Sequence, residues 1–274
     1  MRTFGSAILG LAAVLLAVAA FCSAWVAENV VSDNGFTALG QPLGTDTAFQ
    51  QSLSEAIGQQ AADSLQVPAA VEPFVAPLIT GAVQGVQSLP EYPQAWDETL
   101  RRSHAQTFDG EGGVTLDVAP LVGLVINGVG SETGIEVAPP ESSPVAIAGA
   151  DQRRYVELLV TAAGAWPYLA IGSAVAAVLS LLVARSRTAA LAWLGLGALL
   201  AGGLMWIGAG SLPALADRQA YGSAVSETFA SAFSTEAAAS LQAWTIPFLL
   251  GAAVLLVLGL LGRSLRGVLG GRRR

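Results

Sequence analysis

The sequence predicts an α-helical membrane protein with four transmembrane helices and a mainly helical α+β extracytoplasmic domain that contains a small β-sheet. Two observations predict this fold class. Hydrophobic residues make up 53% of the chain and charged residues only 12%, whereas about a quarter of the residues in a soluble domain are charged. Four uncharged runs are long enough to cross a bilayer, which takes about 20 apolar residues.

The predicted spans lie at residues 1–27, 158–184, 188–211 and 243–262. Small residues at four-residue spacing, such as Gly172 and Ala176, predict close packing between these helices. Ionisable residues inside the bilayer mark ion and proton paths, but the internal polar groups here are Ser173, Ser180 and Thr245. A transporter or channel is therefore not favoured.

The first span is predicted to be an uncleaved anchor, because its apolar stretch is long for a signal peptide. Cleavage stays the alternative, since Cys22, Ser23 and Ala24 loosely resemble a small-x-small cleavage site. Cys22 is the single cysteine of the chain, which excludes an internal disulfide framework.

The charges predict how the chain is oriented. Eight of the 13 basic residues, all arginines, lie in segments without acidic residues: Arg2, Arg185, Arg187, Arg263, Arg266, Arg272, Arg273 and Arg274. The positive-inside rule places both termini, including the basic tail at 263–274, in the cytoplasm, and residues 28–157 outside the plasma membrane. That segment has seventeen acidic residues against four arginines, a net charge of −13, which excludes nucleic acid as a partner. The arginine tail suits anionic membrane lipids.

The domain at residues 28–157 is predicted to begin with helices. Apolar side chains recur every four residues after a cap at Thr45 or Asp46, and the pattern repeats over residues 71–86. A third helix is predicted to start within residues 90–93. Packing these helices on one another is the simplest way to bury their apolar stripes.

In the second part of the domain, the four-residue spacing of apolar side chains gives way to short β-branched runs. Short β-branched runs bounded by Gly and Pro predict strands at residues 113–118, 134–138 and 144–149, with a helix at 119–130 between the first two. From Asp151 a further helix is predicted to continue directly into the second span.

Residues 212–242 predict a second extracytoplasmic segment, an amphipathic helix or a helical pair. Phe229 and Phe233, four residues apart, belong to its apolar face, and the opposite face is acidic. Helices that lie on a bilayer surface usually have basic polar faces. We therefore expect this segment to pack against the domain at residues 28–157.

The candidate interaction or structural residues are Trp96, Arg101, Arg102, His104 and Asp117. His104 is the only histidine, and carboxylates nearby in sequence make general-base chemistry conceivable. Its helical spacing from Trp96 favours a packed histidine instead, and the chain has no GxSxG nucleophile motif.

An EF-hand at residues 109–120 is excluded, because its twelfth position is Pro120 rather than glutamate. No catalytic, cofactor-binding or metal-binding residue is predicted.

Four short segments carry a resemblance: SAWV at 23–26, WDETLRRSH at 96–104, VTLDVAPLV at 114–122 and RRY at 153–155. Together with the order of one span, a helical external domain and three closely following spans, they make the chain resemble a family of actinobacterial four-span integral membrane proteins. The resemblance covers most of the chain. It implies no catalytic residue that can be carried over.

The leading functional hypothesis is a non-enzymatic integral membrane protein of the cell envelope. It would act as an interaction partner or accessory subunit whose external domain contacts an envelope or membrane protein. The alternative is a transport-associated or small-ligand-sensing protein that holds its ligand between the external domain and residues 213–242. A hydrolase centred on His104 is a third and less favoured hypothesis.

Overall fold

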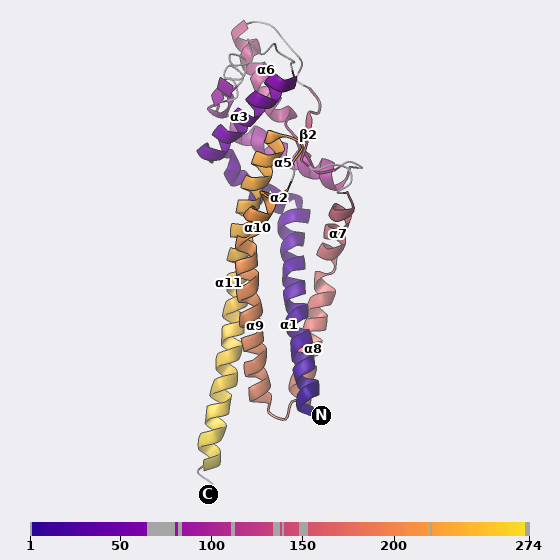
Figure 1. Ribbon diagram of the computed structural model, residues 1–274, viewed down its shortest axis with the longest axis vertical. Coiled ribbons are helices and arrows are strands. Elements are labelled where there is room, and N and C mark those ends of the chain that lie inside the picture. The colour runs from indigo at the N-terminus through magenta and orange to yellow at the C-terminus, as the bar shows by residue number, and fades with distance from the viewer. Residues whose placement is uncertain are drawn as a thin grey trace. The chain divides into compact units, whose positions relative to one another are not determined.

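The computed structural model describes residues 2–64, 80–81, 84–110, 113–133, 138, 140–147, 153–219 and 221–271 (Figure 1). Most of these residues are helical. The described part of the chain contains four helices that are long and apolar enough to cross a membrane, and one two-stranded sheet. The predicted combination of four membrane-spanning helices, further helices and a small sheet is therefore confirmed.

The chain divides into two compact units. Unit 1 comprises residues 1–28, 160–211 and 238–274, and unit 2 comprises residues 29–159 and 212–237. Eight arginines and one acidic residue fall in unit 1, whereas five arginines and nineteen acidic residues fall in unit 2. The charge asymmetry along the sequence is thus also an asymmetry between the two units.

Unit 1 is built from long apolar helices. They are α1 (Arg2–Val26), α8 (Trp166–Val183), α9 (Arg187–Gly210) and the second part of α11 (Ala224–Gly271). α1 packs against both α8 and α9 (Figure 1). Large apolar side chains such as Ile171 and Leu204 are 63% and 71% exposed, as expected of helices that face lipid.

Serine side chains join α1 to α8. Ser6 Oγ donates to the carbonyl oxygen of Ser180, and Ser180 Oγ donates to that of Ser6, both at 2.9 Å. Ser173 Oγ donates to the carbonyl oxygen of Ala13, also at 2.9 Å. Such bonds between helices supply directional attraction where lipid offers no hydrophobic driving force for association.

Glycines bring the backbones of α9 and α11 into contact. A Cβ on Gly195 would lie 2.4 Å from the backbone nitrogen of Leu256. A Cβ on Gly259 would lie 2.4 Å from the backbone nitrogen of Ala192. Because no side chain fits in either position, small residues serve close packing between α9 and α11, whereas a Cβ on Gly172 would make only an ordinary contact, 3.6 Å from Cδ1 of Leu16.

The helix expected to run unbroken into the second span is interrupted. α7 (Arg153–Gly164) ends before a turn at Ala165, and α8 begins at Trp166. Pro167 lies in the first turn of α8. Proline has no N–H to bond to the preceding turn and is tolerated at a helix start, so it favours a new helix over a continuous one. The prediction of one continuous helix is wrong.

The segment at 212–242 and the fourth span share one helix. α10 (Leu212–Ala216) is short, whereas α11 runs without interruption from Ala224 to Gly271. The sequence predicts a boundary between residues 242 and 243, where the hydropathy changes. A change in hydropathy does not by itself end a helix. Phe229 and Phe233 of α11 belong to the same core as helices from residues 28–157, so the expected packing of this segment is confirmed.

Unit 2 begins with three short elements that the sequence pattern did not predict. They are the π-helix η1 (Ala27–Val31), the helix α2 (Asp33–Gly40) and the 3₁₀-helix η2 (Gln41–Gly44). Ser32 caps α2, because its Oγ accepts a hydrogen bond from the N–H of Gly35 at 3.4 Å. These elements have eight residues or fewer, whereas an apolar period is read over a window of about 11 to 18 residues, so periodicity does not reveal them.

The longer helices of unit 2 match the expected ones. They are α3 (Thr47–Ser64), α5 (Tyr92–Phe108) and α6 (Ala119–Thr133). Asp46 caps α3, since its Oδ1 accepts hydrogen bonds from the N–H groups of Ala48 and Phe49 at 2.8 and 2.9 Å. Most of the helix expected over residues 71–86 lies outside the described residues.

The sheet pairs β1 (Thr115–Asp117) with β2 (Pro144–Ala146) in antiparallel orientation. Leu116 lies opposite Val145 in this register. These two strands fall within the expected ranges, and the strand expected at 134–138 lies almost wholly outside the described residues.

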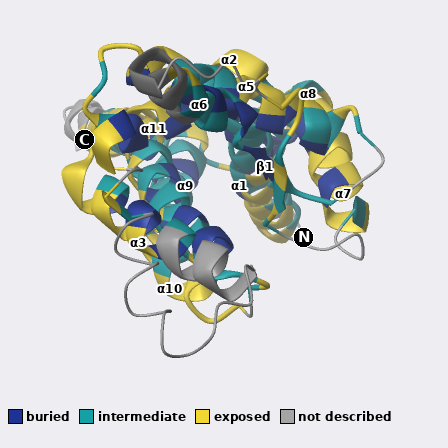
Figure 2. Cartoon of the chain, turned by 90° about the horizontal axis from the view of Figure 1, so that it is seen from above, coloured by how far each residue is buried: buried dark blue, intermediate teal, exposed yellow. Residues whose placement is uncertain are grey.

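The core of unit 2 gathers around α5, whose buried residues are coloured dark blue on the cartoon in Figure 2. Trp96 and Leu100 of α5 are fully buried. Phe49 from α3, Leu116 from β1 and Phe229 from α11 complete the centre of this cluster. The helix that carries four of the five candidate residues is therefore also the centre of the domain.

Candidate functional site

The five candidate residues lie on two adjoining elements of unit 2. Trp96, Arg101, Arg102 and His104 are on α5, and Asp117 ends β1. Trp96 and His104 belong to the buried face of α5, whereas the two arginines are exposed. The helix therefore has one buried and one exposed face.

Trp96 anchors α5 to the start of unit 2. Its Nε1 donates a hydrogen bond to the carbonyl oxygen of Gly40 at 3.0 Å. A Cβ on Gly44 would lie 2.4 Å from Cδ1 of the indole, so the ring lies directly on the backbone there. Phe49 and Phe229 contact the ring, with centroids at 5.7 and 6.5 Å. Trp96 is thus a packing residue whose single polar atom is satisfied.

The two arginines share one carboxylate. Arg101 Nη1 lies 2.8 Å from Glu98 Oε2, and Arg102 Nε lies 2.9 Å from Glu98 Oε1. Arg102 also donates from Nη1 to the carbonyl oxygen of Glu141 at 3.1 Å. Because all three side chains are at least 42% exposed, each ion pair contributes no more than about 0.5 kcal/mol. The second arginine links α5 to the segment before β2.

His104 makes a hydrogen bond to the end of η1. Its Nε2 lies 2.9 Å from the carbonyl oxygen of Val31, and a carbonyl only accepts, so Nε2 carries the proton. Nδ1 is 3.9 Å from Oδ1 of Asp33. The imidazole lies between the rings of Phe36 and Phe108, with centroids at 5.3 and 4.5 Å. The packed histidine favoured by the sequence matches this geometry.

Asp117 is a buried carboxylate with a full set of donors. Its Oδ1 accepts from the backbone N–H groups of Ala119 at 3.1 Å and Ser143 at 2.8 Å. Its Oδ2 accepts from Gln106 Nε2 at 2.7 Å and from Ser142 Oγ at 3.2 Å. The side chain therefore caps the start of α6, holds the entry to β2 and binds α5 at the same time.

Ser103 connects this network to the α5 backbone. Its Oγ accepts from the N–H of Asp117 at 2.8 Å and donates to the carbonyl oxygen of Thr99. A serine nucleophile needs its own proton directed at a base, whereas this proton is directed at a carbonyl. The described residues contain no hydrogen bond that joins His104 to Ser103 or to Asp117.

Sequence reasoning missed the partners that complete these contacts. Gln106 lies three residues after Ser103 and so shares its face of α5, which is a detectable signal. Ser142 and Ser143 come from a distant segment, and no local pattern reveals their pairing. Arg153 is also new. It donates from Nη1 to the carbonyl oxygens of Thr107, at 3.0 Å, and of Gly110, at the C-terminal end of α5.

The five candidate side chains make their contacts with other residues of unit 2. No group of three His, Cys, Asp or Glu side chains is placed to hold a metal ion in the part of the chain that is described. The acidic turn before β1 is only partly described, because Glu111 lies outside that part. The side chains of His104, Arg153 and Asp117 form hydrogen bonds with backbone groups at the end of η1, the end of α5 and the start of α6.

Tyr92 is the buried titratable group at the start of α5. It is 3% exposed and belongs to the core of unit 2. Burial raises the pKa of Tyr92 to about 12, and the Gln87 side chain lowers that pKa by a smaller amount. Burial also raises the pKa of Tyr221, and the negative charges of Asp217 and Glu227 raise that pKa further. The folded state therefore favours neutral tyrosine at both positions.

Comparisons of the chain with protein-family models, with curated protein sequences and with solved structures found no match.

We predict that Asp117→Asn destabilises unit 2. An amide presents one accepting oxygen and a donating nitrogen, so two of the four donors around Asp117 would face another donor. The loss is expected to be about 3 kcal/mol, read as a lower midpoint of thermal unfolding for the full chain in mild detergent. Asp109→Asn, at an exposed position beside α5, is the control and should change stability by less than about 0.5 kcal/mol. Equal midpoints for the two variants would contradict a structural role for Asp117.

We predict that unit 2 loses stability as the pH rises from about 10 to about 12. The pKa of Tyr92 is higher in the folded chain than its ordinary value near 10, so the unfolded chain releases its proton first. Stability from this group is complete below pH 10 and falls through the window, by on the order of 2 to 3 kcal/mol. Thermal midpoints at pH 9 to 12 measure this. Tyr92→Phe should flatten much of the decline, and an unchanged decline would overturn the assignment.

Proposed function

We propose that the chain is a four-span plasma-membrane protein that acts without catalysis, as an interaction partner or accessory subunit in the cell envelope. Unit 2 would lie outside the membrane and contact an envelope or membrane protein. This proposal rests on the contacts of those side chains whose chemistry would suit catalysis or ligand binding. His104, Asp117 and the Arg101–Arg102 pair are all engaged with backbone or side-chain partners inside unit 2.

The charge distribution supports the proposed orientation. Arginines fall at the start of α1, at the α8–α9 turn and at the end of α11. The would-be Cβ of Gly5 lies 3.9 Å from Val183, and that of Gly262 lies 2.7 Å from Thr188, so these helix ends adjoin one another in unit 1. Short segments rich in arginine stay in the cytoplasm. Both termini would then be cytoplasmic, with the acidic unit 2 on the opposite side.

The occupied lone pairs support a non-catalytic role. A general base needs a free lone pair within reach of the proton that it removes. Both oxygens of Asp117 already accept two hydrogen bonds each, and Nε2 of His104 donates to Val31. With its proton on Nε2, His104 keeps a lone pair on Nδ1, but the described residues place no serine, threonine or cysteine in hydrogen bond to that atom.

The packing of α11 favours interaction over ligand sensing. A ligand between residues 213–242 and the rest of unit 2 would need the space next to Phe229 and Phe233. Phe233 contacts the ring of Phe36 with centroids 5.0 Å apart, and Phe229 contacts Trp96 at 6.5 Å. These ring contacts favour packing over a bound ligand next to Phe229 and Phe233.

The chemistry of unit 2 restricts its partners. Nineteen acidic residues against five arginines repel phosphate backbones, so nucleic acid is not proposed. A protein surface with basic groups would be attracted. Membership of the actinobacterial membrane-protein family that the sequence resembles is part of the same proposal, because that family has the same order of spans and external domain.

The proposed orientation predicts which positions react with a membrane-impermeant maleimide in intact cells. In a chain that carries Cys22→Ser, Ser52→Cys on the exposed face of α3 should be labelled. Arg185→Cys in the α8–α9 turn should be labelled only after the cells are permeabilised. The cysteine-free chain measures the background. The reverse labelling pattern would overturn the orientation.

The proposed partner can be captured by photo-crosslinking in the native membrane. A benzophenone amino acid at Gln94, which is exposed on α5, should give a protein adduct on irradiation. The same group at Val175, 52% exposed on α8, is the matched control and should give lipid adducts. The absence of any protein adduct at Gln94, or an adduct with the mass of two copies of this chain, would overturn the accessory-subunit proposal.

A further inference from the structure

A groove lies in unit 1 where α8 ends and α9 begins. Its volume is about 340 Å³. It is lined by Val178, Leu181, Leu182, Arg187, Thr188 and Leu191. Four of these six side chains are aliphatic, so most of the wall offers contact only to an apolar occupant.

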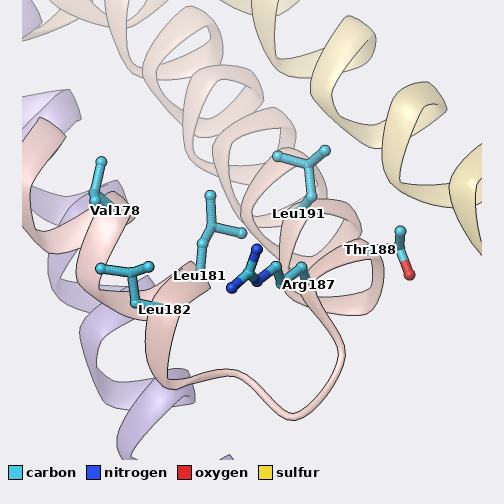
Figure 3. Close-up of a pocket in the computed structure, with 6 residues that line it drawn as sticks. All are labelled: Val178, Leu181, Leu182, Arg187, Thr188 and Leu191. Atoms are coloured by element: carbon cyan, nitrogen blue, oxygen red, sulfur yellow. The ribbon is translucent and has the colours of Figure 1, made fainter.

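Arg187 is the charged group of this groove. Figure 3 shows its side chain extending from the start of α9 toward Leu181 at the end of α8. Arg187 has no acidic partner among the described residues, and residues 160–211 contain no acidic residue at all. A guanidinium beside aliphatic side chains, without a carboxylate, is a strong attractor for an anion.

Other arginines add positive charge near the groove. Arg185 belongs to the same turn and is exposed. Arg263 is also exposed, and it follows Gly262, which approaches Thr188 in the groove wall. The local field at this end of unit 1 therefore favours an occupant with net negative charge over a zwitterionic one.

We propose that this groove binds one anionic phospholipid. Arg187 would hold the phosphate through its forked N–H donors, which match the geometry of phosphate oxygens. An acyl chain would lie along Val178, Leu182 and Leu191. This occupant satisfies both features of the site, since free phosphate would leave the aliphatic wall uncovered and an apolar helix would leave the guanidinium unpaired.

The inference is separate from the proposed envelope role. It requires that the four apolar helices lie in a bilayer, but it does not depend on which side faces the cytoplasm. A lipid at this position would fix the α8–α9 turn at the headgroup level and so support the depth of both helices in the membrane.

The test compares two arginines of the same turn. The full chain, Arg187→Gln and Arg185→Gln are purified in mild detergent and titrated with phosphatidylglycerol or with phosphatidylcholine. Native mass spectrometry then gives the fraction of protein that retains one lipid. Arg185 is the matched control, because it is exposed in the same turn but does not line the groove. Thermal midpoints confirm that both variants remain folded.

The expected result is one phosphatidylglycerol bound to the full chain, with at least about tenfold weaker binding in Arg187→Gln. Arg185→Gln should weaken binding by no more than about fivefold. Equal losses in the two variants would overturn the proposal in favour of diffuse charge attraction. Equal retention of phosphatidylcholine, or full displacement of the lipid by inorganic phosphate at the same concentration, would overturn it as well.

Discussion

The contact of Trp96 with the backbone at Gly40 and Gly44 is the constraint on which unit 2 depends. A buried indole contributes a large apolar surface, but its N–H needs an acceptor, and the Gly40 carbonyl supplies one. Gly44 allows the chain to approach the ring, because a Cβ there would collide with Trp96, and Gly40 allows the same close approach to Leu100. With one side of the ring fixed in this way, α3 and α11 cover it with phenylalanines. One residue of α5 therefore positions three segments that are distant in sequence.

The buried polar residues of unit 2 act where helices and strands end. The first N–H groups and the last carbonyls of a helix have no partner within it, and burying them unpaired is costly. His104 bonds the last carbonyl of η1, Arg153 bonds carbonyls at the end of α5, and Asp117 bonds the N–H of Ala119 at the start of α6. Side chains that the sequence made candidates for chemistry thus form hydrogen bonds with backbone groups at the ends of helices.

The sequence predicts those parts of the structure that repeat. The spans, α5 and the Asp46 cap of α3 follow from apolar runs, four-residue spacing and a capping side chain. The helices over residues 27–44 have eight residues or fewer, and the break at Ala165 depends on how one proline is accommodated. The network of Asp117 needs Ser142 and Ser143, whose approach depends on strand pairing across an intervening helix. Non-local pairing of this kind leaves no periodic signal in one sequence.

The polar groups of the spans point to the same division of roles. Ion and substrate paths need side chains whose donors or acceptors are free to exchange partners. Ser173 and Ser180 instead donate to carbonyls across the α1–α8 contact, and Thr245 donates to the Leu241 carbonyl of its own helix. A carbonyl of a helix within lipid has no water to replace such a donor, so breaking these bonds would be costly. Ser173 and Ser180 therefore hold α1 and α8 together, whereas the hydroxyl of Thr245 is satisfied within its own helix.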